Sequence, residues 1–371
     1  ATTGLFTMLL GAVIALFKDD LKALLAFSTV SQLGMVTMLL GLGTEAGVIA
    51  AVFHIINHAT FKAALFMTAG IVDHEAGTRS MKLLGGLRKL MPITFIIGTI
   101  AALSMAGVFP LNGFISKEMM LEEAIHTTWA GHPHLFGIVA SIAATFSVAY
   151  SLRFISGTFL GPVRDDYPHH PHDPGLGLLF SPGLLVVLVV LIGLMPMTMA
   201  GWLVTASADA VTGHATHPHL ALWHGVNTPL MISMGALLIG ALMVAFHAPL
   251  QRIWDATPRP EAKTIFDAII RRAVRWAQAI NDGLHDGRLA RGAGMMAATI
   301  VLAGTFAWIT GRAGPETRAM LPITPVAAIG FVLLIVATAC MVVFHRNRLL
   351  ALVLIGIVGL IVSCAFVYLS A

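Results

Sequence analysis

The sequence predicts an all-α protein, a polytopic transmembrane helical bundle of about ten spans with one broken helix and one amphipathic lateral helix. Of its 371 residues, 57% are hydrophobic and only 11% are charged, whereas a soluble domain carries roughly 25% charged residues. The apolar residues form continuous runs of about 20, the length of a helix that crosses a bilayer. Because the runs do not alternate with polar residues, they favour helices over a β-barrel. This composition excludes a soluble enzyme, a nucleic-acid-binding protein and a disordered segment.

Ten segments are candidates for membrane spans. The chain begins without Met inside an apolar run and ends without a polar tail, so we expect a fragment of a longer protein with no signal peptide before the first span. Cys340 and Cys364 lie inside apolar runs and indicate neither a disulfide framework nor a metal cage. The expected spans are roughly 1–17, 20–43, 46–71, 92–127, 134–160, 176–200, 226–248, 293–311, 322–344 and 349–370.

The segment 92–127 is too long for one straight span and is interrupted at residues 109–113, with the sequence FPLNG. It is either two full crossings or one broken crossing. With one broken crossing, 17 of the 22 Lys and Arg residues fall on one side of the membrane, and the opposite side receives only Arg312 and Arg318. Two crossings would remove this asymmetry, so the positive-inside rule favours a single broken crossing.

Residues 249–292 do not form a span. Apolar residues from Ile265 through Trp276 to Leu284 recur at three- and four-residue steps, and charged residues such as Arg272 fill the other faces. The pattern over 261–289 predicts an amphipathic helix along the membrane surface or against neighbouring spans. We therefore expect three parts: residues 1–250, a lateral helix within 251–292, and further transmembrane helices in 293–371.

Within the third span, His54, His58 and Lys62 are four residues apart and share one helix face. Ionisable residues inside a membrane are costly and are functional candidates by default. Three titratable groups about 6 Å apart on one face predict a path along which protons move, directly or through water. A metalloprotease site is excluded, because Ile55 stands where the catalytic Glu would have to be.

Lys117 and Glu118 follow the interruption of the fourth span and form the second candidate site. Transporters place ion sites at broken helices, where unwound backbone lines a buried or wet cavity. The alternative is that the break lies near the surface and both residues are solvated.

Other polar residues carry weaker signals. Lys22 opens the second span, where Ser28 and Gln32 are either a polar lining or helix-packing positions. Arg153 lies near the inner end of its span, which favours a snorkelling side chain. The histidines of two loops are interpreted as parts of solvated turns rather than metal ligands: His169, His170 and His172, and His214, His217, His219 and His224.

Four motifs resemble the antiporter-like membrane subunits that respiratory complex I shares with Mrp-type cation/proton antiporters. They are DLKALLAFSTVSQLG at 20–34, FHIINHATFKAALF at 53–66, GGLR at 85–88 and FISKE at 114–118. The motifs occur in the family's order over about residues 1–160.

The resemblance implies roles for individual residues. His54, His58 and Lys62 would belong to a central hydrophilic proton path, Lys117 would close the second half-channel, and Lys22 would be a further member of the path. Glu118 stands where the complex I version often has Asp.

The C-terminal part indicates the branch of the family. Three spans follow the lateral helix, where a large complex I subunit normally has one, and LWHGVNTPL at 222–230 also resembles the large A subunit of Mrp antiporters. Residues 1–250 would then be the C-terminal part of a proton-translocation module.

The resemblance therefore implies a subunit of a multisubunit Na⁺/H⁺ antiporter in the cell (inner) membrane. Its partners would be other integral membrane subunits, Na⁺, H⁺ and the lipid bilayer, with no cofactor, no bound metal and no nucleic acid. One alternative is a proton-pumping subunit of complex I or of a membrane hydrogenase. Another is a structural membrane subunit with inert titratable residues.

Overall fold

The computed structural model describes residues 1–129, 131–223, 225–258, 262–284, 289–311 and 324–370. The chain divides into two compact units, Ala1–Arg259 and Pro260–Ala371. Within the described residues all regular structure is helical, apart from two isolated β-bridges. Eight helices are long and apolar enough to cross a membrane, and α1 and α4 are shorter apolar helices. The chain is therefore an all-α, multi-pass membrane protein.

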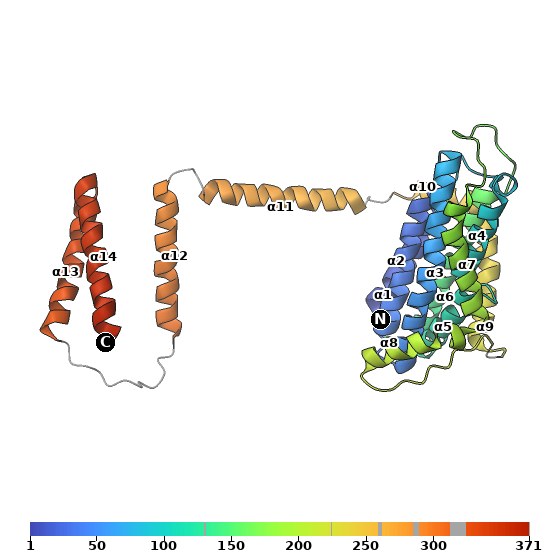
Figure 1. Ribbon diagram of the computed structural model, residues 1–371, viewed down its shortest axis with the longest axis horizontal. Coiled ribbons are helices and arrows are strands. Elements are labelled where there is room, and N and C mark those ends of the chain that lie inside the picture. Colours follow the sequence, from blue (N-terminus) through green and yellow to red (C-terminus); the bar gives the residue numbers. More distant parts are fainter. Residues whose placement is uncertain (130, 224, 259–261, 285–288, 312–323, 371) are drawn as a thin grey trace. The chain divides into compact units, whose positions relative to one another are not determined.

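The first unit begins with three antiparallel helices, α1 (Thr2–Leu16), α2 (Leu21–Leu40) and α3 (Glu45–Ala76) (Figure 1). Asp20 and Thr44 begin α2 and α3, because each side chain accepts a hydrogen bond from a backbone N–H of the first turn. Helices α1 and α2 touch through their backbones. A Cβ on Gly34 would lie 2.5 Å from the Met8 nitrogen, so only glycine allows this approach.

The fourth crossing is broken, as the charge pattern predicted. After the short helix η1 (Leu87–Lys89), α4 (Pro92–Ala106) and α5 (Asn112–His126) run one after the other along α3. Gly98 of α4 approaches Thr68 of α3, whereas Ser116 of α5 contacts His54. The two short helices thus follow α3 in the opposite direction and make one crossing together.

The rest of the first unit contains α6 (Leu135–Phe159), α7 (Leu176–Leu194), α8 (Trp202–Thr212), α9 (Thr228–Ala245) and α10 (His247–Ala256). The span expected over 176–200 is shorter, because α7 ends at Leu194 and a π-helical turn, η2 (Met197–Gly201), follows Pro196. Helix α8 was not expected. It packs against α3 through Val204 and Ala208, which are one turn apart.

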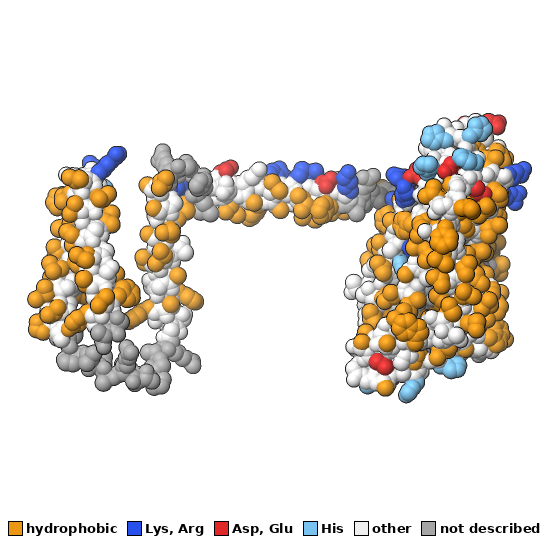
Figure 2. Space-filling view, in the orientation of Figure 1, with side chains coloured by type: hydrophobic (Ala, Val, Ile, Leu, Met, Phe, Trp, Pro, Cys, Tyr) orange, Lys and Arg blue, Asp and Glu red, His pale blue; other side chains and the backbone are white. Residues whose placement is uncertain are grey.

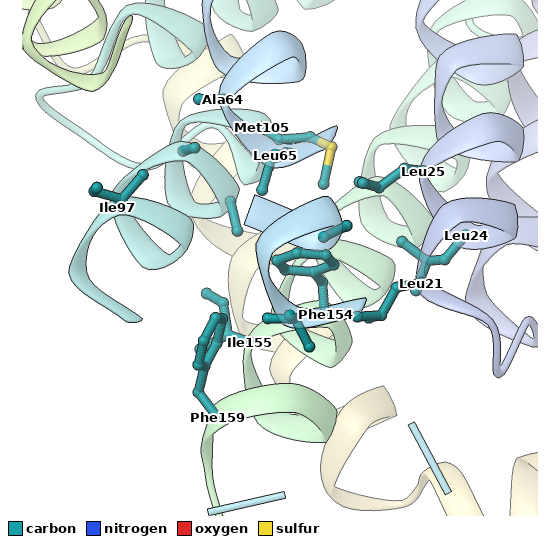
Figure 3. Packing of buried hydrophobic residues seen from close by; sticks show 14 of the residues in the cluster. Leu21, Leu24, Leu25, Ala64, Leu65, Ile97, Met105, Phe154, Ile155 and Phe159 are labelled. Atoms are coloured by element: carbon teal, nitrogen blue, oxygen red, sulfur yellow. The ribbon is translucent and has the colours of Figure 1, made fainter. Parts of the chain in front are cut away.

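Buried apolar side chains fill the space between these helices. Figure 3 shows one such cluster, in which Leu25 of α2, Met105 of α4 and Phe154 of α6 converge. Lys and Arg side chains gather at one end of the first unit on the face shown in Figure 2. The orientation of this end toward the cell interior stays a prediction.

The second unit contains α11 (Ala262–Leu284), α12 (Leu289–Thr310), α13 (Pro325–Phe344) and α14 (Arg348–Ser370). Helices α13 and α14 pack against each other. Helix α11 is amphipathic, with apolar side chains along one face and charged side chains along the other (Figure 2). Arg312 and Arg318, on which the charge count also relied, lie outside the described residues, as do residues 261, 285–288 and 322–323 of the expected helices.

Candidate functional site

His54, His58 and Lys62 form one row inside the first unit, on the face of α3 that meets α2, α4 and α5. His54 is fully buried and Lys62 is 5% exposed, while His58 is half-buried. The ring centroids of the two histidines are 6.0 Å apart, and the Phe61 ring meets His58 edge-on at 5.6 Å. The four-residue spacing thus places three titratable groups in sequence along a buried surface.

The ammonium of Lys62 is surrounded by neutral atoms. Its Nζ donates to the Ser28 hydroxyl at 2.6 Å and to the Leu25 carbonyl at 3.3 Å, both on α2. It also lies 3.3 Å from the sulfur of Met105 on α4. Among the described residues, no carboxylate forms an ion pair with Lys62.

The histidine row continues to the start of α5, because His54 Nδ1 lies 2.9 Å from the Ser116 hydroxyl. The Nε2 atoms of His54 and His58 are buried and have no hydrogen-bond partner among the described residues. Each imidazole therefore keeps one ring nitrogen free to exchange a proton with water or with a neighbouring group.

Asn112 holds the helix break in place. Its Oδ1 accepts from the Ser104 hydroxyl of α4 at 2.6 Å, and its Nδ2 donates to the Thr60 hydroxyl of α3 at 3.1 Å. Its backbone carbonyl accepts from Asn57 Nδ2 at 3.0 Å. Gly113 has no room for a side chain, since a Cβ there would lie 2.0 Å from the Ser104 carbonyl oxygen. One side chain thus joins the two half-helices to the helix that carries the histidines.

Lys117 lies one turn into α5 and is 6% exposed. Its Nζ donates to the Ala106 carbonyl, at the end of α4, at 3.1 Å and to the Ser147 hydroxyl of α6 at 2.8 Å. Gly107 has a left-handed backbone with φ of 84°, and a Cβ there would meet the Lys117 stem at 2.8 Å. The break therefore supplies both a carbonyl acceptor and the space that the lysine occupies.

Glu118 is 7% exposed and follows Lys117 on the helix, but within the described residues the two do not form an ion pair. Both candidate residues of the break are thus buried rather than solvated, and they act as separate groups.

Lys22 lies at the start of α2, away from Lys62. Its Nζ forms a 2.7 Å ion pair with Asp73, and both side chains are partly exposed, at 41% and 31%. Sequence reasoning missed Asp73, which lies beyond the expected end of the third span. It also missed Ser147 and Tyr150 of α6, for which the signal was a pair of polar residues three apart in an apolar run.

Arg153 is buried and paired rather than extended to solvent. It donates to the Lys18 carbonyl at 2.6 Å and to Asp19 at 2.5 Å, and Lys82 contacts the same carboxylate at 2.8 Å. Burial acts to raise the pKa of Asp19, but the hydrogen bond from Lys82 and the charges of Arg153 and Lys82 outweigh it and hold the pKa below its ordinary value. The hydrogen bond and the charge of Asp19 raise the pKa of Lys82 in turn.

The loop histidines are exposed where the structure describes them, and His224 lies outside the described residues. His172 Nδ1 contacts Glu75 at 3.3 Å, at the C-terminal end of α3. In the described part of the chain, no three His, Cys, Asp or Glu residues are placed to hold a metal ion.

Comparisons with known proteins identify relatives. Residues 1–147 match the family model described as NADH:quinone oxidoreductase/Mrp antiporter, TM, and residues 333–371 match the model for the D subunit of MBH. The A/B subunit of a probable K⁺/H⁺ antiporter of Rhizobium meliloti is 39% identical over 384 residues, which cover 99% of this chain and 38% of the relative. The A subunit of the Na⁺/H⁺ antiporter of Alkalihalophilus pseudofirmus is 33% identical, with 99% and 49% covered.

Among solved structures, the Mrp complex from Dietzia sp. DQ12-45-1b contains a chain with 36% identity and a TM-score of 0.70, covering 99% of this chain and 40% of that one. The chain thus spans less than half the length of these relatives. Its motifs, its helix order and its full-length similarity agree: residues 1–147 match the membrane domain that NADH:quinone oxidoreductase shares with Mrp antiporters, and over 99% of its length the chain is similar to A subunits of cation/proton antiporters.

Proposed function

We propose that this chain is part of the large subunit of a multisubunit Na⁺/H⁺ antiporter in the cell membrane, where it conducts protons without redox or nucleotide chemistry. The observation that carries the proposal is the pair of buried lysines, Lys62 and Lys117, each bonded to neutral oxygens and without a carboxylate partner in the described structure. An uncompensated ammonium inside the membrane is costly. Each lysine can therefore release its proton readily and take it up again, as a relay requires.

We assign a separate role in the proton path to each candidate residue. Lys62 is the central relay, and His54 and His58 extend the path from it toward the helix break. Lys117 and Glu118 form the terminal gate, and Lys22, paired with Asp73 near the C-terminal end of α3, is a further member of the path. Residues 1–250 are the C-terminal part of the proton-translocating module, the lateral helix within 251–292 contacts neighbouring membrane subunits, and 293–371 adds transmembrane helices.

Lysine substitutions in the complete antiporter complex test this function. Lys62→Ala and Lys117→Ala are expected to abolish cation-dependent proton flux in inverted membrane vesicles. Lys62→Arg and Lys117→Arg are expected to fail as well, because arginine keeps the charge but does not release its proton. Lys89→Ala, at an exposed position, is the matched control and retains flux. Wild-type flux in the alanine variants, with normal assembly, would contradict the proposal.

The cation is tested in the same vesicles. Proton flux that depends on Na⁺ and not on K⁺ supports a Na⁺/H⁺ antiporter. Proton flux that depends on K⁺ and not on Na⁺ indicates a K⁺/H⁺ antiporter instead.

A second candidate is a proton-pumping subunit of complex I or of a membrane hydrogenase, favoured by the match of residues 333–371 to the model for the D subunit of MBH. Purification of the native complex distinguishes the two. Flavin and iron–sulfur subunits in the complex would support the pump, and their absence, together with cation-driven flux, supports the antiporter.

A third possibility is a purely structural subunit. In that case His54→Ala and His58→Ala lower the amount of assembled complex and leave the flux per complex unchanged.

A further inference from the structure

A group of buried polar side chains on α2 and α6 extends from one lysine of the proposed path, Lys117, toward the other, Lys62. Lys117 Nζ donates to Ser147 Oγ at 2.8 Å, and Ser147 Oγ donates to the Tyr150 hydroxyl at 2.9 Å. Gln32 Nε2 donates to the same Tyr150 hydroxyl at 2.8 Å and lies 3.3 Å from Ser147 Oγ. Tyr150 is fully buried, and Ser147 and Gln32 are 1% and 3% exposed.

From Gln32 the group approaches Lys62. Gln32 lies one helical turn after Ser28, which is the residue that Lys62 contacts at 2.6 Å, so the two polar side chains share a face of α2 about 6 Å apart. Gln32 Oε1 is buried and has no hydrogen-bond partner among the described residues. A buried polar atom of this kind is usually satisfied by an ordered water, and one water there would span the step from Tyr150 and Gln32 to Ser28.

The histidine row does not make this connection. His54 contacts Ser116, and no hydrogen bond joins either histidine to Lys117 in the described structure. Ser116 and Lys117 are adjacent in α5, so their side chains leave the helix about 100° apart. Lys117 faces α6, whereas Ser116 faces α3.

Resting on the proposed function, we infer that Tyr150, held by Gln32 and Ser147, carries the proton between Lys117 and Lys62. Lys117 gives a proton to Ser147 as Ser147 gives its own to Tyr150. Tyr150 in turn gives its proton to a water at Gln32, and the water gives one through Ser28 to the neutral amine of Lys62. Each hydroxyl and the water gains one O–H bond and loses one, so Lys117 ends with one proton fewer and Lys62 with one more.

The chain offers matched variants for a test in the complete antiporter complex. Tyr150→Phe and Ser147→Ala each remove one hydroxyl from the connection. Tyr167→Phe removes a tyrosine hydroxyl that donates to the Gly85 carbonyl in a loop. Ser151→Ala removes a buried hydroxyl one turn along α6, which donates to the backbone carbonyl of Ser147 at 2.7 Å. Each control variant thus loses a hydroxyl that is not itself a member of the proposed connection.

We expect Tyr150→Phe and Ser147→Ala to lower the maximal proton flux per assembled complex about tenfold or more, with the half-saturating cation concentration unchanged. Because the slowed proton step then limits turnover, the ratio of rates in H₂O and D₂O rises above the wild-type value. Tyr167→Phe and Ser151→Ala keep both the flux and the isotope ratio. If Tyr150 and Ser147 only support the structure, Tyr150→Phe and Ser147→Ala lower the amount of assembled complex, and the complex that still forms has the wild-type ratio of rates in H₂O and D₂O. That result would overturn the inference.

The same assay separates this inference from the proposed function. If Lys62→Ala and Lys117→Ala lose flux while Tyr150→Phe or Ser147→Ala stays within twofold of wild type, the connection through α6 is wrong and the function stands. If the lysine variants keep wild-type flux, the proposed function itself fails.

Discussion

Lys62 and Lys117 are buried side chains that have neutral partners and form no ion pair among the described residues. Each ammonium has two or three neutral acceptors within 3.3 Å, enough to orient it but without an anion to fix its charge. Arg153, by contrast, has the carboxylate of Asp19 at 2.5 Å and stays charged. On the proposed function, the neutral neighbours of Lys62 and Lys117 distinguish these relay lysines from the ion-paired Arg153.

At this scale we predict that Asp19→Asn destabilises the protein by about 2 kcal/mol at pH 7, because it leaves the buried Arg153 without its anion. The pKa of Asp19 is lowered in the folded state, so its ion pairs stabilise the fold above the ordinary carboxyl pKa of about 4. This stabilisation is lost as the pH falls through the lowered pKa. We therefore expect the wild type to unfold at a higher temperature than Asp19→Asn at pH 7, and this difference in unfolding temperature to be smaller at pH 3. Thermal unfolding of the detergent-solubilised complex at the two pH values measures it.

Asp20→Asn is the control for this prediction. Asp20 pairs with Arg79 in an exposed ion pair and caps α2, and asparagine keeps the cap. We expect a loss of less than about 1 kcal/mol, and an equal loss for both variants would contradict the role of Arg153.

The sequence was sufficient to select His54, His58, Lys62 and Lys117, because a titratable residue in an apolar run is conspicuous and a four-residue spacing defines a helix face. It was not sufficient to find Tyr150 or Asp73. The contacts of Tyr150 depend on how α6 packs against α2, which is distant in the sequence. Asp73 lies beyond the expected end of the third span, in the part of α3 that hydropathy did not predict.

The broken crossing is the element that brings the site together, and its geometry depends on Gly113. We predict that Gly113→Ala, whose Cβ would lie 2.0 Å from the Ser104 carbonyl, destabilises the protein by about 3 kcal/mol and lowers the amount of assembled complex. Gly70→Ala in α3 adds the same methyl group into open space and is expected to have little effect. Equal assembly of the two variants in size-exclusion chromatography would contradict this account of the break.

Hydropathy predicted which segments are helices better than it predicted where each helix ends. Helix α3 was expected over 46–71 and extends to Ala76, because hydropathy ends before the helix does; Gly77, with φ of 69°, terminates it. Helix α8 was missed, since eleven residues of mixed polarity carry no span signal; Val204 and Ala208 pack it into a cluster that includes residues of α3.

For the whole molecule, the low fraction of charged residues was enough to predict a multi-pass helical membrane protein. Helix α11 exposes the apolar side chains of Phe266, Ile269 and Trp276 in this structure. If the proposed contact with neighbouring subunits is right, Ile269→Glu lowers the recovery of partner subunits with the tagged chain. Gln278→Glu places the same side chain nine residues away, on the opposite face, and leaves recovery unchanged. Equal recovery for both would contradict the contact.

The glycines between α1 and α2 have a consequence for motion. At Gly4, Gly11 and Gly34 the two backbones lie so close that an added Cβ would meet the opposite chain at 2.3–2.6 Å, which leaves no clearance for one helix to slide or turn against the other. Ser28 and Gln32 are carried on this closely packed hairpin. On the proposed function, we therefore expect α1 and α2 to keep their positions during turnover while hydroxyl groups and lysine side chains rotate to pass the proton.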